Sequence, residues 1–340
     1  THEEERISKI RKLQDMVRKY HLYEIRANTL RNVLEAEYVS KIRIAIKIPA
    51  PDWKSVYEWG DYYLALGLKK EFERYNCSVL LQVLPEWNNQ EDRDCDVVLV
   101  LRGLSQYKPR KHQFNIMWNI SHPDSVEIEE YNQYDHVFIA SYLWSEKIKE
   151  TADVPVDVLL QCTDPELFYP DKSERYRHDL LFAGNSRKVK RKILEDLLPT
   201  EYNLAVYGTN WSKLIPGDYV KDEHIPNQEL RKAYSSCKIL LNDHWDDMRV
   251  KGFLSNRLFD GFASGAFIIS DDVEGASDIF DDALITYKSP EDLHSLIDHY
   301  LNHKSERIEK SMKGQSIVTR DHTFQKRVEC IMDILPEKIV

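Results

Sequence analysis

Short apolar segments alternate with longer amphipathic ones along most of this chain, and this alternation constrains its fold more than any other feature. In the first half, five segments have the length and apolar content of β-strands: Lys41–Ile48, Ser78–Leu84, Val97–Leu101, Phe114–Trp118 and His136–Ala140. Helical spacing is found between them over Val56–Tyr75 and Tyr142–Thr151. Strands that alternate with helices predict a parallel sheet covered by helices on both faces.

A second alternation follows in the other half of the chain. Its predicted strands are Asp179–Ala183, Tyr202–Tyr207, Lys238–Asn242, Ala266–Ser270 and Leu284–Thr286. Its predicted helices are Lys188–Leu198, Gln228–Ser236, Asn256–Ser264, Glu291–Asn302, Ser305–Ser316 and His322–Leu335. We therefore predict an α/β protein with two Rossmann-like domains, over residues 41–158 and 159–320, and a helix in 321–340 that packs back on the first domain. Ligands of such folds bind at the carboxyl ends of the strands, so a cleft is expected between the domains.

Residues 1–40 differ from the rest. Ile7, Ile10, Leu13 and Val17 recur at three- and four-residue spacing, with charged residues between them. This spacing predicts a helical extension. It either packs on the following domain or forms a coiled-coil or linker helix to another module.

Composition excludes several classes of protein. Of the 340 residues, 42% are hydrophobic and 11% aromatic, which excludes a mainly disordered chain. The formal net charge is −10, which argues against a nucleic-acid partner. No apolar run approaches the roughly 18 residues of a membrane span, and the charged start does not resemble a signal peptide. We expect a cytoplasmic location, with any membrane contact made through partners.

The first segment with chemical character runs from Leu180 to Arg187. An apolar strand leads into Gly184, Asn185 and a basic run, Arg187, Lys188, Lys190, Arg191 and Lys192. Glycine lets a ligand approach the backbone, and a helix N-terminus attracts anions. Cations are unfavourable at that end of a helix, so a bound phosphate or diphosphate would explain the basic run. The alternative is an ordinary strand–turn–helix with a solvated basic face.

The second segment is Gly252–Ser270. Ser255 is placed to cap a helix that begins at Asn256, whose first-turn amides and Arg257 would face a phosphate. Asp260 follows one turn later and could accept hydrogen bonds from the two hydroxyls of a ribose. Gly265 is placed to end this helix.

These two segments and a third resemble a known family. The stretches GFLSNRLFDGFASGAFIISDD, LLFAGNSRKVKRKILEDL and IPNQELRKAYSSCKILLNDHW are similar to the C-terminal half of CgeB-like glycosyltransferases of the GT-B class. The resemblance covers about residues 155–335. It implies a GT-B fold, a nucleotide-diphosphate sugar as donor, and a role in bacterial surface-polysaccharide synthesis.

The resemblance also implies roles for individual residues. Asp260 stands where related enzymes have the second Glu of a Glu-x7-Glu motif, which binds ribose, while Gly252 replaces the first. Gly184 and Arg187 match the phosphate-side loop. The base pocket would be lined by Tyr207, Gly208, His224 and Ile225.

Asp243 and His244 directly follow a predicted strand, so we expect them to face the cleft and contact the donor sugar. With Asp246 and Asp247, Asp243 could be mistaken for a metal-binding pair of carboxylates. In this architecture arginines and helix dipoles neutralise the leaving diphosphate instead, so we expect no metal and no other cofactor. His299 and His303 are four residues apart on a predicted helix, but the sequence shows no third ligand for zinc.

Two segments of the first half suit the acceptor side. Tyr57–Tyr63 offers aromatic faces together with Asp61, and His122 follows the predicted strand Phe114–Trp118. Either Asp61 or His122 could take the proton of an acceptor hydroxyl. The alternatives are core aromatics at a helix start and a histidine in a turn.

The sequence thus predicts transfer of a hexose or deoxyhexose from a UDP, dTDP or GDP sugar to a glycan or lipid-linked glycan. Arg187, Arg191 and Arg257 would stabilise the leaving diphosphate. Two alternatives stay open. One is a sugar-nucleotide epimerase, and the other is a non-catalytic sugar-nucleotide-binding or scaffold module that works with other modules of a synthesis complex.

Overall fold

The computed structural model describes residues 2–20, 23, 26–27, 42–186, 188–337 and 339. By its internal contacts the chain forms two units, Thr1–Ile42 and Arg43–Val340. The first unit contains α1 (His2–Tyr20), whose apolar residues Ile7, Ile10 and Leu13 are exposed. Most of the helix predicted after residue 20 lies outside the described residues. Among the helices that the structure describes, none is long and apolar enough to cross a membrane.

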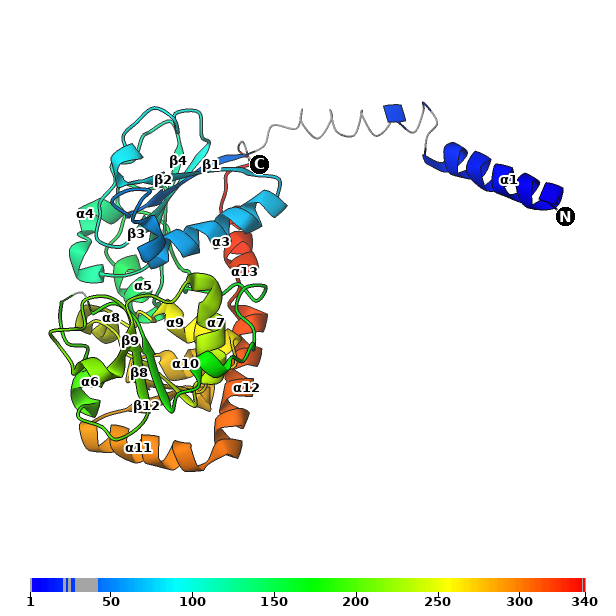
Figure 1. Cartoon of the computed structure of the whole chain (residues 1–340). Helices are drawn as coiled ribbons and strands as arrows, with labels where there is room; N and C mark the ends of the chain where they lie inside the picture. Colours follow the sequence, from blue (N-terminus) through cyan, green and yellow to red (C-terminus); the bar gives the residue numbers. More distant parts are fainter. Residues whose placement is uncertain are drawn as a thin grey trace. The chain divides into compact units, whose positions relative to one another are not determined.

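The second unit begins with a parallel sheet, part of which is labelled in Figure 1. It has six strands in the order β2-β1-β3-β4-β5-β6. Its strands are β1 (Arg43–Ile48), β2 (Ser78–Val83), β3 (Val97–Arg102), β4 (Phe114–Asn119), β5 (His136–Ile139) and β6 (Val156–Val158). The helices of this domain are α3 (Gly60–Arg74), α4 (Ile128–Tyr131) and α5 (Tyr142–Lys149). Because helices cover both faces, β3 is buried at every residue, and Val97–Leu101 forms a continuous apolar run.

The second domain repeats this arrangement, with the parallel strand order β12-β11-β10-β7-β8-β9. Its strands are β7 (Leu180–Ala183), β8 (Leu204–Tyr207), β9 (Val220–Asp222), β10 (Ile239–Asn242), β11 (Ile268–Asp271) and β12 (Ile285–Tyr287). Its helices are α6 (Lys192–Leu197), α7 (Asn227–Ser236), α8 (Asp246–Val250), α9 (Asn256–Ala263), α10 (Ala276–Phe280), α11 (Pro290–Asn302), α12 (Lys304–Asp321) and α13 (Phe324–Asp333).

Side chains alternate across the second sheet and feed two separate cores. Leu180 and Phe182 of β7 join the core that contains α6 and α11. Leu181 and Ala183 of the same strand join the core on the opposite face, with residues of α9 and α12. This two-residue alternation is the direct result of strand geometry, and it places helices on both sides.

The expected α/β fold with two facing Rossmann-like domains is confirmed, since each half of Arg43–Val340 forms one parallel sheet with helices. Strands β6 and β9 were not predicted, because each has only three residues and carries exposed charged side chains. The predicted helix Val56–Tyr75 is divided into a 3-10 turn, Val56–Glu58, and α3.

The last helices connect the two domains. Helix α12 packs against α9 of the second domain, and α13 then packs against α3 of the first (Figure 1). The contact between α13 and α3 is close, because a Cβ atom added at Gly67 would lie 2.5 Å from the ring of Phe324. The chain therefore crosses between the domains twice, at residues 159–179 and again before α13.

Candidate nucleotide-sugar site

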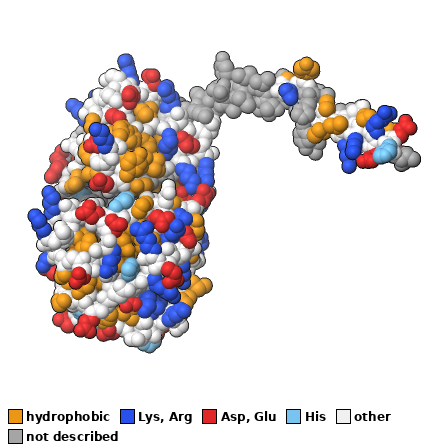
Figure 2. All heavy atoms as spheres, in the orientation of Figure 1, with side chains coloured by type: hydrophobic (Ala, Val, Ile, Leu, Met, Phe, Trp, Pro, Cys, Tyr) orange, Lys and Arg blue, Asp and Glu red, His pale blue; other side chains and the backbone are white. Residues whose placement is uncertain are grey.

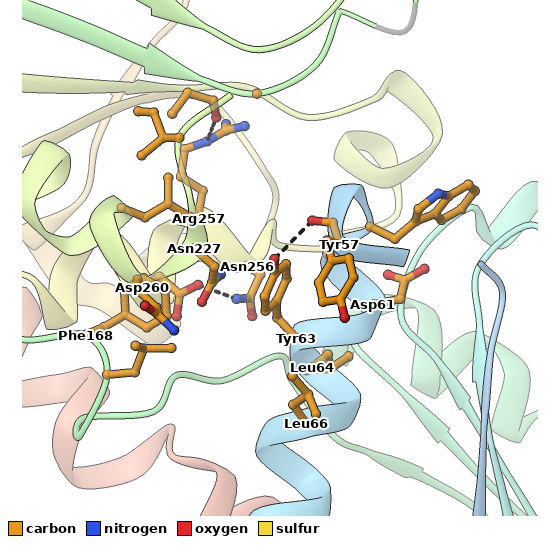
Figure 3. A pocket seen from close by; sticks show the side chains of 18 of the residues that line it. Tyr57, Asp61, Tyr63, Leu64, Leu66, Phe168, Asn227, Asn256, Arg257 and Asp260 are labelled. Atoms are coloured by element: carbon orange, nitrogen blue, oxygen red, sulfur yellow. Dashed lines mark hydrogen bonds between the residues drawn. The ribbon is translucent and has the colours of Figure 1, made fainter. Parts of the chain in front are cut away.

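A cavity of about 540 Å³ is lined by residues of both domains (Figure 3). On the second-domain side it is lined by the carboxyl ends of β7 and β8 and by the first turns of α9. In this sheet β8 and β10 lie on opposite sides of β7, so the strand order reverses at β7. Loops diverge at such a switch point and leave a crevice, which is where open parallel sheets bind ligands.

Arg257, on the first turn of α9, contacts the ends of both strands that meet at this switch point. Its Nε donates to the carbonyl oxygen of Ala183 at 2.8 Å, and its Nη1 donates to Oδ1 of Asn242 at 2.7 Å. Both acceptors are neutral, and no carboxylate of the described residues forms an ion pair with this guanidinium. Burial lowers the pKa of Arg257, which means that its charge is held at a desolvation cost. Such a cation is suited to an anionic ligand.

Gly184 brings the backbone close to that guanidinium. A Cβ atom at this position would lie 2.5 Å from Nη2 of Arg257. Gly208, at φ +138°, lies against the same turn, and its added Cβ would meet the carbonyl oxygen of Gly184 at 2.2 Å. The two glycines therefore allow the loops after β7 and β8 to approach each other and Arg257.

Asp260 lies one turn further along α9 and faces the same cavity (Figure 3). Its Oδ1 accepts from the hydroxyl of Thr163 at 2.8 Å, and its Oδ2 accepts from the amide of Asn256 at 2.7 Å. Burial raises the pKa of Asp260 to about 8, although both hydrogen bonds oppose this shift. The carboxyl group is thus positioned from both sides, by α9 and by the segment that joins the domains.

The other end of the cavity is formed after β8. Tyr207 and Ile225 line it and are buried, whereas His224 lines it and is exposed. Asn185 also lines the cavity, and its Oδ1 accepts from the backbone N–H of Thr209 at 2.9 Å. This end of the cavity thus combines apolar side chains with the polar side chains of Asn185 and His224.

The first domain supplies an aromatic wall, made by Tyr57, Tyr63 and residues of the first turns of α3 (Figure 3). The hydroxyl of Tyr63 donates to the carbonyl oxygen of Tyr57 at 3.0 Å. Asp61 lines the cavity on the same wall. Tyr57 and Leu66 are exposed, and Figure 2 shows hydrophobic side chains gathered on one face of this domain. This wall offers flat apolar surface beside a carboxylate.

Most of the residues singled out from the sequence line this one cavity: Asp61, Gly184, Asn185, Tyr207, Gly208, His224, Ile225, Asn256, Arg257 and Asp260. They come from segments up to 199 residues apart (260 − 61).

Arg191 and Asp243 do not line this cavity. The guanidinium of Arg191 forms a buried ion pair with the carboxylate of Asp243 and also donates to its backbone carbonyl at 3.0 Å. Contrary to the expectation that Asp243 faces the cleft, it is buried against Arg191, because each charge compensates the other away from water. Helix α6 begins only at Lys192, four residues later than predicted. Arg187 lies outside the described residues.

His244 and Ser255 have structural partners as well. Nδ1 of His244 lies 2.7 Å from Oδ1 of Asp271, and its Nε2 accepts from the backbone N–H of Ser255 at 2.9 Å. His244 is buried and does not line the cavity, contrary to the expectation that it faces the cleft. Ser255 is the N-cap residue of α9 as predicted, but its hydroxyl donates to Asn242 instead of capping the helix.

His122 lies elsewhere at the domain junction. It adopts φ +50° before the turn Pro123–Ser125, and its Nδ1 is 3.6 Å from Oδ2 of Asp247 in α8. It does not line the cavity, so of the two predicted bases only Asp61 does.

Thr163 and Asn242 were missed by the sequence analysis. Thr163 follows β6, a strand too short to recognise, and Asn242 was taken only as the end of a strand. Asn242 accepts from both Arg257 and Ser255. A polar residue at the carboxyl end of a central strand was the available signal.

Comparison with known proteins bears on this site. Residues 187–333 match the model of a family described as "Glycosyl transferase-like". The chain shows no significant match to a curated protein sequence.

Three solved structures illustrate the fold. Sucrose-phosphate synthase from Thermosynechococcus elongatus has a TM-score of 0.67 at 10% identity, over 86% of this chain and 98% of that one. T4 phage BGT, solved with its UDP-glucose substrate, has a TM-score of 0.58 at 15% identity, over 88% and 99%. An alpha-glucosyltransferase in complex with UDP-glucose and DNA has a TM-score of 0.59 at 10% identity, over 87% and 99%.

That last complex contains DNA, so the exclusion of nucleic acid drawn from net charge has no support from these neighbours. At these identities the likeness shows the fold alone. Together with the family match over residues 187–333, it shows a GT-B fold and supports a glycosyltransferase.

Proposed function

We propose that this protein is a glycosyltransferase that moves a hexose or deoxyhexose from a nucleotide-diphosphate sugar to a glycan or lipid-linked glycan acceptor. The observation that carries the proposal is Arg257, a partly buried guanidinium that neutral oxygens hold against a cavity at the strand switch point. Two structural neighbours were solved with UDP-glucose, so UDP is the nucleotide to test first.

Each proposed role is assigned from the place of the residue in the cavity wall. Arg257 and the first-turn amides of α9 would neutralise the diphosphate as it leaves, which is the main electrostatic demand of the reaction. Asp260 would accept hydrogen bonds from the ribose, and the end of the cavity at Tyr207, His224 and Ile225 would hold the base. This requires no metal or other cofactor.

The acceptor would bind on the aromatic wall of the first domain. Its hydroxyl oxygen attacks the anomeric carbon, the bond from that carbon to the diphosphate oxygen breaks, and the diphosphate leaves with the electron pair. The hydroxyl proton passes to a base, for which Asp61 is the candidate that lines the cavity. Enclosure between two domains would limit attack by water on the donor.

We further propose that the chain belongs to the CgeB-like group and acts in the cytoplasm in bacterial capsule or O-antigen synthesis. The segments GFLSNRLFDGFASGAFIISDD and LLFAGNSRKVKRKILEDL support this placement.

A thermal-shift screen with UDP, dTDP, GDP, CDP and ADP tests the donor site. At 100 times its Kd, a bound nucleotide should add about 2.7 kcal/mol of stability. We expect one diphosphate to stabilise the wild type and Arg257→Ala to lose most of this effect. Arg231→Ala is the matched control, because Arg231 pairs with Asp171 and does not line the cavity. If no nucleotide stabilises the wild type, the proposal fails.

One observation favours a second function, a sugar-nucleotide-binding module without transfer. Gly252 stands in place of the first Glu of the family motif, and it packs against Ser141 instead of lining the cavity. Nucleotide binding without turnover over a panel of donors and acceptors would support this module. Conversion of the donor sugar without any acceptor would point to an epimerase.

A further inference from the structure

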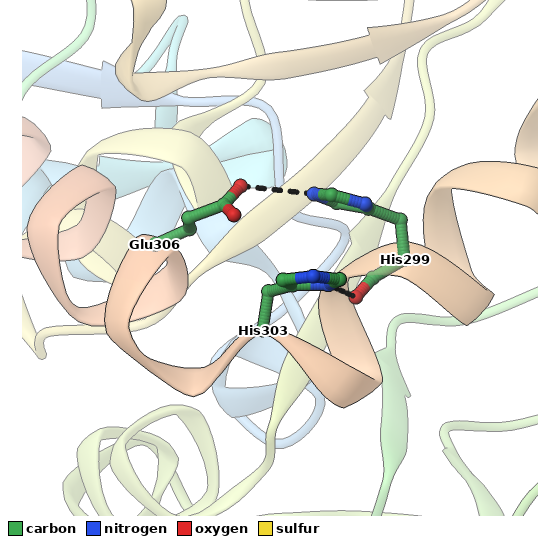
Figure 4. A group of neighbouring side chains, drawn as sticks. All are labelled: His299, His303 and Glu306. Carbon is green, nitrogen blue, oxygen red and sulfur yellow. Dashed lines mark hydrogen bonds and ion pairs between the residues drawn. The ribbon is translucent and has the colours of Figure 1, made fainter.

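A cluster of two histidines and a glutamate lies at the corner between α11 and α12, outside the site described above (Figure 4). His303 forms this corner, since it is both the residue that ends α11 and the residue that precedes α12. His299 lies in the last turn of α11, and Glu306 lies in the first turn of α12. One ligand atom from each of the three side chains lies within 4.8 Å of the other two.

The three side chains lie against one another. The two imidazole rings stack with centroids 4.0 Å apart and planes 15° from parallel. Nε2 of His299 lies 2.9 Å from Oε2 of Glu306. Nδ1 of His303 lies 2.6 Å from the carbonyl oxygen of His299, so this nitrogen carries a proton and donates it. The lone pair of His303 is therefore on Nε2, and the carbonyl holds the ring as outer partners of metal-bound histidines do.

Arg307, the residue after Glu306, does not pair with this glutamate. Arg307 donates to the backbone carbonyl oxygens of Tyr300 and Leu301, which leaves the carboxylate of Glu306 to the histidines. Side chains of His299 and Glu306 are 45% and 43% exposed, so an ion can reach them from solvent.

We propose that His299, His303 and Glu306 bind a divalent transition-metal ion of the zinc class, with water at the remaining position. Imidazole nitrogens and a carboxylate are ligands that zinc takes at bond lengths of about 2.0–2.2 Å, which in tetrahedral geometry puts ligand atoms about 3.3 Å apart. Nε2 of His299 and Oε2 of Glu306 are joined by a hydrogen bond of 2.9 Å, so the ion would replace the proton between them. The ring of His303 would turn out of its stack with His299 to bring Nε2 to the same ion. The sequence spacing had offered two ligands, and the turn between the helices adds the third.

The ion would act as a structural clip. Helix α11 belongs to the core on one face of the second sheet, through Leu293 and Ile297. Helix α12 belongs to the core on the other face, through Val318. The three ligands thus stand where the chain turns from one face of the sheet to the other. None of them lines the cavity, and Figure 1 shows α11 at the end of the second domain away from the first. The ion therefore takes no part in the proposed transfer.

Calorimetric titration of the untagged full chain with Zn²⁺, after removal of metal by a chelator, tests the proposal. We expect one ion per chain and a loss of affinity of tenfold or more in His303→Gln and Glu306→Gln. His294→Gln and Glu309→Gln are matched controls on the same two helices and should bind as the wild type does. Because the ligands are exposed, the metal-free variants should keep the wild-type Tm, which shows that they fold.

Two further readouts separate this site from others. Saturating Zn²⁺ should raise the Tm of the wild type by a few degrees and leave that of His303→Gln unchanged. Co²⁺ should give the intense visible absorption of tetrahedral coordination in the wild type only. No stoichiometric binding by the wild type, or equal binding by His303→Gln, would overturn the proposal. Nucleotide binding is measured separately and should be the same with Zn²⁺ and with chelator, so a failure here leaves the donor site untouched.

Discussion

At the scale of single residues, the candidate donor site depends on one close contact between a glycine and an arginine. The 2.5 Å approach of an added Cβ at Gly184 to Nη2 of Arg257 means that this position has room only for hydrogen. The two hydrogen bonds of Arg257 to Ala183 and Asn242 fix where its charge is held. A methyl group at Gly184 would therefore displace the guanidinium of Arg257 and leave the backbone in place, because the end of a long side chain moves more easily than the main chain.

We predict that Gly184→Ala weakens binding of the nucleotide diphosphate that the thermal-shift screen identifies. A displaced charge-assisted hydrogen bond costs about 1.5–3 kcal/mol, or roughly 10- to 100-fold in Kd. Calorimetric titration of the two proteins measures this. Gly217→Ala is the control, because an added Cβ there has no neighbour within 4 Å. Unchanged affinity in Gly184→Ala would mean that Arg257 does not contact the phosphates.

At the scale of elements, the two domains are joined by the packing of α13 on α3. The ring of Phe324 occupies the space that a side chain at Gly67 would need. Arg327 of α13 adds hydrogen bonds to the carbonyl oxygens of Leu160 and Gln161, at 2.6 and 3.1 Å, in the segment that follows β6. The last helix is thus held by both domains.

We predict that Gly67→Ala destabilises the protein. Alanine normally favours a helix over glycine by about 1 kcal/mol, but overpacking against Phe324 costs about 1–3 kcal/mol. Gly60→Ala in the same helix is the matched control, since an added Cβ there meets nothing within 4 Å, and its Tm should be equal or higher. Thermal unfolding compares the two. A rise in Tm for Gly67→Ala would show that α13 can shift away from α3 at little cost.

At the scale of the whole molecule, stability depends on pH through buried groups near the domain junction. Burial, with a further contribution from the charge of Arg327, lowers the pKa of His322 to about 4. The neutral ring accepts from Nη2 of Arg327 at 2.7 Å. In the unfolded chain this pKa is about 6.5. The unfolded state therefore binds more protons between these values, and stability is lost as the pH falls from 6.5 to about 4.

We predict that His322→Gln makes stability less sensitive to acid. Glutamine keeps an acceptor for Arg327 but does not titrate, so the wild type should lose up to about 1.4 kcal/mol more per pH unit between pH 6.5 and 4.5. Asp260 acts in the opposite direction, because between about pH 4 and pH 8 its raised pKa makes the folded state bind more protons than the unfolded state, so its contribution to stability grows as the pH falls. That contribution is common to both proteins and cancels in their difference. Urea unfolding of both proteins at several pH values measures this difference in the free energy of unfolding. The assignment would be contradicted if the stability of both proteins fell equally with pH.

The two α/β halves can be read from the sequence alone, because strand and helix periodicities are local and each face of a sheet must be buried. The sequence also indicated Gly184, Arg257 and Asp260, since a glycine after a strand and a charged first turn of a helix are local patterns. Which charged side chains remain available to a ligand depends on contacts between distant parts of the chain. Arg191 and Asp243 are 52 residues apart and neutralise each other, whereas Arg257 meets only neutral oxygens. In the same way, Thr163 reaches Asp260 across 97 residues. Pairings of this kind depend on how the sheets, helices and domain crossings bring distant side chains together, and no local pattern carries that information.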